Sequence, residues 1–179
     1  MVDFEKIWEQ FDYVIREMRD EGMCFFEGFI LSVSDEKLYE AIRSLCSPPL
    51  DAALKLSTWS NDTTKEERNK FYTTDQYLEL FRVGKIVTLQ PEYEPIQNEI
   101  KLHLKIMIEK WDNKLTAEII CYRGPILSSH DPKQAVRAAL LEFLRLKQLL
   151  GGSTLYIGPD TLNYPESAKI YPEEWIKIA

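Results

Sequence analysis

The sequence predicts an α+β protein, an antiparallel sheet of four or five strands with helices packed mainly on one face. Two segments lead to this prediction: a long β-hairpin between Ile100 and Tyr122, and a strong helix from Pro132 to Leu150. Shorter strand-like and helix-like segments flank them, and we expect these to pack around that pair. The 179 residues hold no internal repeat, low-complexity tract or dividing linker, so we expect one domain over residues 1–179.

Alternation of side chains predicts the hairpin. Aliphatic residues occupy every second position of its first strand, and successive side chains of a strand point to opposite faces. These residues are Ile100, Leu102, Leu104, Ile106 and Ile108. In the second strand the corresponding set is Leu115, Ala117, Ile119 and Cys121. Asp112-Asn113 suits the tight turn between the strands. One apolar and one mixed face are typical of an antiparallel sheet that is covered on one side only.

Capping and periodicity predict the helix that covers this apolar face. Asp131 can cap it, Pro132 fits its first turn, and Gln134 completes a pattern like a capping box. The apolar stripe is wide, so we expect burial on more than one side. The stripe comprises Val136, Leu140, Leu141, Phe143, Leu144, Leu146, Leu149 and Leu150. The solvent side is assigned Arg137, Glu142, Arg145, Lys147 and Gln148. Gly151-Gly152 ends the helix.

Further elements are predicted before the hairpin from periodicity and turn residues. The expected helices are Asp3–Glu21, Asp35–Leu45, a short one over Leu50–Leu56, and Asp75–Phe81 with Thr74 as its cap. The expected strands are Met23–Val33, in which Gly28 marks a bulge or a close backbone approach, and Lys85–Gln90. The first helix is amphipathic, which suits docking into a partner groove or packing on its own sheet, and we favour the packing.

Three segments are expected to lie at the surface. Residues 57–70 form a polar excursion, from which we expect Trp59 to pack back onto the core. Pro91–Pro95 is predicted to be an acidic connector into the hairpin. After a strand at Thr154–Ile157, the tail Thr161–Ala179 is expected to be irregular, with a short helix or strand near its end.

Charge and cysteine content narrow the class of function. A formal charge of −7 and a pI near 5.0 argue against nonspecific binding to nucleic acid or to an anionic membrane, which need a positive field. The same charge suits a basic protein partner, or simply a solvated surface. The three cysteines, Cys24, Cys46 and Cys121, lack the spacing of a disulfide framework or zinc site. No signal-peptide pattern and no apolar run near the ~20 residues of a membrane span occur, so we expect a cytoplasmic protein.

The sequence lacks the recognised motifs of metal binding, nucleophilic catalysis and nucleotide binding. His103 and His130 do not have metal-ligand spacing, so we expect no metal site. On the alternation His103 and Cys121 lie on opposite faces, which argues against a Cys–His pair. The sequence holds no glycine-rich phosphate loop and no nucleophile elbow, so we expect no cofactor.

Mixed aromatic and acidic segments point instead to a protein interface. Tyr and Trp anchor interfaces, and carboxylates steer a basic partner. The candidate partner-binding residues are Glu92, Tyr93, Glu94, Tyr164, Glu166, Tyr171, Glu173, Glu174 and Trp175. We interpret the chain as a non-enzymatic acidic protein-binding module that neutralises or escorts a basic partner, like an immunity protein or antitoxin. In the other interpretation of the tail, its aromatic residues clamp it to the domain.

The mixed face of the hairpin supports a second class of function. A pocket between sheet and helices would belong to a small-molecule-binding protein or an enzyme. Its candidate residues are Lys101, His103, Lys105 and Tyr122. A deep pocket around His103 would favour this alternative, and a flat solvated face would count against it.

Overall fold

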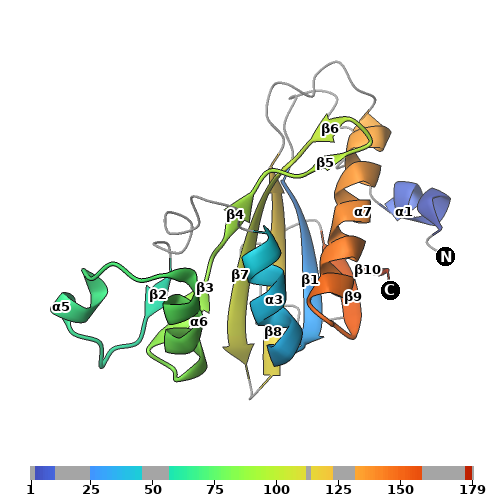
Figure 1. The fold of residues 1–179 in the computed structure, drawn as a ribbon. Helices are drawn as coiled ribbons and strands as arrows, with labels where there is room; N and C mark the ends of the chain where they lie inside the picture. The colour runs from blue at the N-terminus through green and yellow to red at the C-terminus, as the bar shows by residue number, and fades with distance from the viewer. Residues whose placement is uncertain are drawn as a thin grey trace.

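The computed structural model describes residues 3–10, 25–45, 57–111, 114–122, 132–158 and 176–178, and confirms the α+β fold (Figure 1). The described helices are α1 (Phe4–Gln10), α3 (Asp35–Leu45), α5 (Lys65–Arg68), α6 (Thr74–Arg82) and α7 (Pro132–Leu149). The first five strands are β1 (Phe25–Val33), β2 (Thr58–Trp59), β3 (Ile86–Leu89), β4 (Glu92–Tyr93) and β5 (Ile96–Gln97). The others are β6 (Ile100–Lys101), β7 (His103–Trp111), β8 (Lys114–Tyr122), β9 (Thr154–Gly158) and β10 (Ile176–Lys177).

All pairings of the main sheet are antiparallel, and over the described residues it has eight strands. The order is β10-β9-β1-β8-β7-β3-β2, and β4 also pairs with β7. This is more than the four or five strands expected, because β2, β4 and β10 have two residues each. Two residues are too few for alternation to show. We expected the segments of β2 and β4 to be a surface excursion and a connector, and both instead pair with the sheet.

The predicted hairpin is confirmed over His103–Tyr122, as β7 and β8. Its expected first residues differ, because Ile100 and Lys101 form β6, which pairs with β5 in a separate two-stranded sheet. Trp111 pairs with Lys114 at the turn and His103 pairs with Tyr122 at the far end. Leu104 faces Cys121, so the apolar sets of the two strands share one face, as the alternation requires. The five aliphatic residues of the first strand are all buried. This face of the sheet packs against the core.

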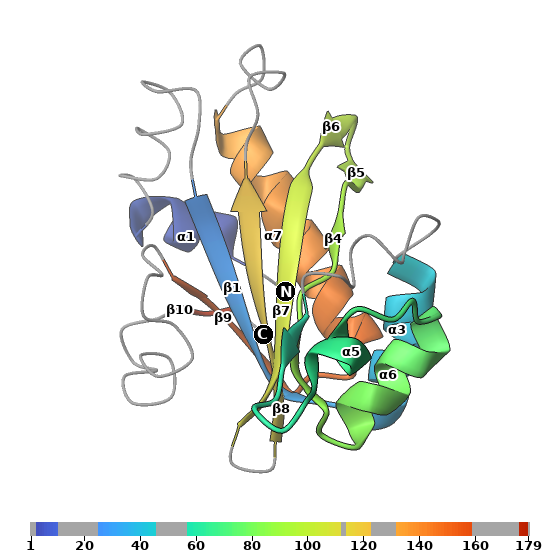
Figure 2. The same cartoon turned by 90° about the vertical axis from the view of Figure 1, so that its left-hand side faces the viewer.

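Helices α3 and α7 lie on the same side of β1, β7 and β8 and cover this apolar face (Figures 1 and 2). The close approach of α7 depends on small residues: Ala135, Ala138 and Ala139 are buried, and Gly28 lies under Phe143. A Cβ built on Gly28 would meet Phe143 Cδ2 at 2.8 Å. Of the two roles considered for this glycine, the structure supports the close backbone approach.

Three buried side chains correct the expected polarity of the long helix and the sheet. We placed Glu142 on the solvent side of the long helix, but its side chain is 1% exposed. We expected the second face of the sheet to stay open, but Phe29 and Glu118, which pair across β1 and β8, are 3% and 2% exposed. The mixed face is therefore buried over part of its area.

The peripheral helices join the same core. Ile7 of α1 is buried, and the Arg137 guanidinium of α7 lies 4.5 Å from the Phe4 ring centroid, so the described part of α1 packs on its own domain. Residues 11–21 of that expected helix, and the segment 50–56, lie outside the described residues. Thr73, not Thr74, caps α6 in a full capping box with Gln76.

Two smaller expectations concern Trp59 and the short element near the C-terminus. Trp59 packs back onto Tyr72 and Tyr77, with ring centroids 5.9 and 6.3 Å away, as expected. The short element near the C-terminus is a strand, β10, paired with β9. No helix within the described ranges has the length and apolar character needed to cross a membrane.

Candidate functional site

Strand β4 divides the predicted partner-binding residues between the two faces of the sheet. Glu92 pairs with Lys105 and Tyr93 pairs with Leu104, so consecutive residues of β4 take the two faces of β7. Tyr93 points towards α7, on the side of the core. Glu92 and Glu94 lie on the opposite side, beside His103.

Four outward side chains form what we term the outer cluster: Glu92, Glu94, Lys101 and His103. Lys101 Nζ lies 2.9 Å from Glu94 Oε2, and His103 Nδ1 lies 3.3 Å from Glu94 Oε1. His103 Nε2 lies 3.6 Å from Glu92 Oε2, so the imidazole is placed between two carboxylates. The structure thus brings two candidates of the partner-binding set together with two candidates of the pocket set.

The outer cluster is open to solvent. The His103 side chain is 41% exposed, and the other three are exposed to a similar degree. Hydrogen bonds from Lys101 and then His103 lower the pKa of Glu94, which favours its ionised form. Within the described part of the chain, no group of three or more metal-ligating side chains is placed to hold a metal ion. The arrangement suits charge recognition at a surface.

The other two pocket candidates lie on neighbouring positions of the hairpin. Lys105 pairs with Glu92 and is half-buried, and Tyr122 pairs with His103 across β7 and β8. The register therefore gathers all four candidates at one end of the hairpin.

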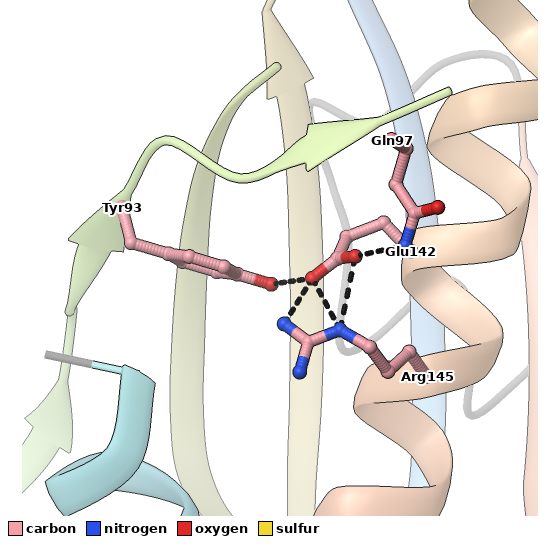
Figure 3. A network of polar contacts seen from close by, with 4 residues as sticks. All are labelled: Tyr93, Gln97, Glu142 and Arg145. Atoms are coloured by element: carbon pink, nitrogen blue, oxygen red, sulfur yellow. Dashed lines mark hydrogen bonds and ion pairs between the residues drawn. The ribbon is translucent and has the colours of Figure 1, made fainter. Parts of the chain in front are cut away.

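A second polar group, the inner network, lies on the other side of β4 (Figure 3). Tyr93 donates to Glu142 Oε1 at 2.6 Å, and Gln97 Nε2 donates to Glu142 Oε2 at 2.8 Å. Arg145, three residues further along α7, donates from Nε to both oxygens at 3.0 Å. One buried carboxylate thus ties β4 and β5 to the long helix.

The hydrogen bonds of the inner network keep the buried Glu142 carboxyl ionised. Burial raises the pKa of Glu142, but the hydrogen bonds from Arg145, Gln97 and Tyr93 lower it by more, so the net shift is downward. Burial, and then the hydrogen bond to Glu142, raise the pKa of Tyr93. Tyr93 therefore stays protonated as a donor, and Glu142 stays ionised as an acceptor.

Sequence reasoning missed this network, although a signal existed. Residue 142 lies three or four positions from Ala138, Ala139 and Leu146, which are all buried. It therefore falls inside the apolar stripe of the helix. We assigned it to the solvent side from its charge, and its helical position was the better guide.

The hairpin β5–β6 extends the outer surface beyond β4. Ile96 pairs with Lys101 and Gln97 pairs with Ile100 around a two-residue turn at Asn98-Glu99. Both turn residues have positive φ, +49° and +66°, as a type I′ turn requires. Gln97 and buried Ile100 take the inner side, whereas Ile96 is 70% exposed.

Several candidates lie outside the described residues and remain predictions. They are Tyr164, Glu166, Tyr171, Glu173, Glu174 and Trp175 in the tail, together with His130, Cys24 and Cys46. Cys121 lies in β8, where it pairs with Leu104 of β7 and Phe26 of β1.

Comparison with known proteins adds a resemblance in shape. Neither a family model nor a curated protein sequence matches the chain. A similar solved structure is a chain from the crystal structure of the toxic C-terminal tip of CdiA from Pseudomonas aeruginosa in complex with immune protein. The match has a TM-score of 0.47 and 12% sequence identity, and covers 77% of this chain and 87% of that chain. A likeness of this degree carries no argument about function.

Proposed function

We propose that this protein is a non-enzymatic protein-binding module that neutralises or escorts a basic protein partner, in the manner of an immunity protein or antitoxin. The observation that carries the proposal is the outward placement of Glu92, in β4, and of Glu94, just after it, beside the hairpin β5–β6 with its exposed Ile96. Exposed carboxylates on a rigid sheet attract a cationic surface at long range and fix its register on contact.

The distribution of charge along the chain supports the same proposal. Acidic residues outnumber basic ones by 29 to 22. The two kinds nearly balance within the described ranges, so most of the acidic excess belongs to the other segments, including residues 159–175. We infer that this aromatic and acidic tail contributes to the binding surface together with the outer cluster.

A pull-down from the lysate of the native cell tests the function. The immobilised protein is incubated at about 50 mM and about 500 mM salt, since the higher salt shortens the Debye length several-fold. We expect a basic protein, identified by mass spectrometry, to be retained at low salt and released at high salt. An empty bait at low salt, or retention of acidic proteins only, overturns the proposal and favours the small-molecule alternative.

Matched variants then locate the surface. Glu92→Gln with Glu94→Gln removes two carboxylates of the outer cluster, and Glu9→Gln with Glu40→Gln removes two exposed carboxylates elsewhere. We expect the first pair to reduce retention of the captured protein and the second pair to leave it unchanged. Trp175→Ala with Glu173→Lys tests the tail. Unchanged retention by that variant would remove the tail from the binding surface.

A further inference from the structure

We propose that the hairpin β5–β6 is the element that selects the partner. In this proposal Ile96 enters an apolar depression on the basic partner, while Glu94 and Glu99 pair with cationic side chains around it. The inference rests on the proposed function, because it takes a basic protein as the occupant. It adds which part of the surface makes the specific contact.

The exposed apolar side chain is the first argument. Ile96 is 70% exposed, and its pairing with Lys101 places it on the outer face of the hairpin, the side of the outer cluster. An isoleucine left in water here adds nothing to the core, but its burial against a partner would be favourable. Interface anchors are often apolar side chains within a ring of polar groups.

The charge around Ile96 points to the chemistry of the partner. Residues 92–101 contain the carboxylates of Glu92, Glu94 and Glu99 and one ammonium group, that of Lys101. Lys101 is already paired with Glu94. Lys105, which pairs with Glu92 across β4 and β7, adds a second ammonium group, so carboxylates still outnumber ammonium groups on this surface. An excess of carboxylates complements a basic partner and disfavours an acidic one.

The hairpin is held in place before binding. Gln97 is bonded to buried Glu142 at 2.8 Å, and Leu102 N donates to Pro95 O at 2.9 Å. Ile100 is buried in the main core, and Figure 1 shows β5 and β6 beside α7. A segment fixed in this way loses little conformational entropy on binding, which suits it for a specific contact.

The turn carries a residue that folding alone does not favour. Glu99 has φ of +66°, a conformation that glycine adopts readily and that strains a residue with a side chain. Strained residues tend to be kept where they serve binding or catalysis. A glutamate at this position places a carboxylate at the tip of the hairpin, next to exposed Asn98.

A defined cationic probe tests the assignment on the intact protein. The probe is a synthetic peptide of alternating lysine and leucine, titrated at low salt while backbone and methyl NMR shifts are recorded. We expect the largest shifts at Glu94, Ile96 and Glu99. Ile96→Ala should weaken the affinity about tenfold, whereas the control Val87→Ala, at another exposed apolar side chain, should change it less than about twofold.

Two further titrations separate charge from apolar contact. An all-lysine peptide of the same length should bind more weakly than the alternating peptide, and Ile96→Ala should leave its affinity unchanged. Glu99→Gln should weaken both peptides, with Glu40→Gln as the control. Shifts centred away from residues 94–101, or no binding of the alternating peptide, overturn the hairpin proposal. The salt-dependent capture of a basic protein then decides the proposed function separately, because it does not depend on which element makes the contact.

Discussion

Tyr93 in β4 donates a 2.6 Å hydrogen bond to Glu142 in α7, which lies 49 positions later in the chain. Glu92, in the same short strand, and Glu94, just after it, lie on the opposite side. The inner network therefore sets the position of the outward carboxylates, because β4 cannot turn without breaking a buried hydrogen bond. Gln97 fixes the adjoining hairpin through the same carboxylate. A single glutamate of the long helix thus supports both β4 and the hairpin β5–β6.

Replacing this glutamate tests that role. Glu142→Ala leaves Tyr93, Gln97 and Arg145 without their shared acceptor, and we expect a loss of about 2–4 kcal/mol in the free energy of unfolding. The lower part of this range applies if Arg145, which is partly exposed, turns towards solvent. Urea unfolding followed by circular dichroism measures it. The control Glu40→Ala, at an exposed position of α3, should stay within about 0.5 kcal/mol of wild type. Equal stabilities of the two variants would contradict a structural role for the network.

The pH dependence of stability gives a second test of Glu142. Its pKa in the folded protein lies below the ordinary value of 4.5. Below about pH 4.5 the unfolded state therefore binds more protons than the folded state does. The stabilisation from Glu142 is lost as the pH falls through the pKa of this carboxyl in the folded protein. We expect wild type to be more stable than Glu142→Gln at about pH 7, with the difference shrinking towards about pH 3. Urea midpoints measured across this range check it. The raised pKa of Glu109 is common to both proteins and cancels in the difference. A difference that does not change with pH would mean that folding leaves the pKa of Glu142 unshifted.

Long periodic patterns explain why much of the fold was predictable. Strand β7 has nine residues and α7 has eighteen, enough for a period of two or of 3.6 to stand out. The strands β2, β4 and β10 are two residues long, so their presence depends on distant pairing partners. No local pattern in the sequence specifies that pairing.

The candidate site was predictable in its members and not in its arrangement. Glu92, Glu94, Lys101 and His103 were all singled out, but in two separate sets. They meet because β4 pairs with β7 in the register Glu92 to Lys105. Tyr93 was grouped with its neighbours for its aromatic ring, whereas alternation along a strand sends it to the other face. A strand at residues 92–93, had it been expected, would have separated these roles.

The hairpin turn provides a test of strain. Glu99→Gly removes the side chain from a residue with φ of +66°, and we expect a gain of about 1 kcal/mol in stability, partly offset by the greater freedom of glycine in the unfolded chain. Thermal unfolding measures the gain. Asn98→Gly, where φ is +49°, is the control and should gain less, since asparagine tolerates this conformation. A destabilised Glu99→Gly protein would show that the glutamate side chain supports the native turn.

The contact between Gly28 and Phe143 tests how closely α7 sits on the sheet. A Cβ at residue 28 would lie 2.8 Å from Phe143 Cδ2, so we expect Gly28→Ala to destabilise the protein by about 1–3 kcal/mol. Phe143→Leu replaces the rigid ring with a smaller side chain that can turn away from residue 28. In a double-mutant cycle the two substitutions should show a coupling of about 1 kcal/mol or more. Gly84→Ala is the matched control. A Cβ at residue 84 meets nothing within 4 Å, but φ there is +85°. Gly84→Ala therefore loses stability through backbone strain alone, and Phe143→Leu should not restore it. Additive effects at Gly28 and Phe143 would mean that α7 shifts to admit the methyl group.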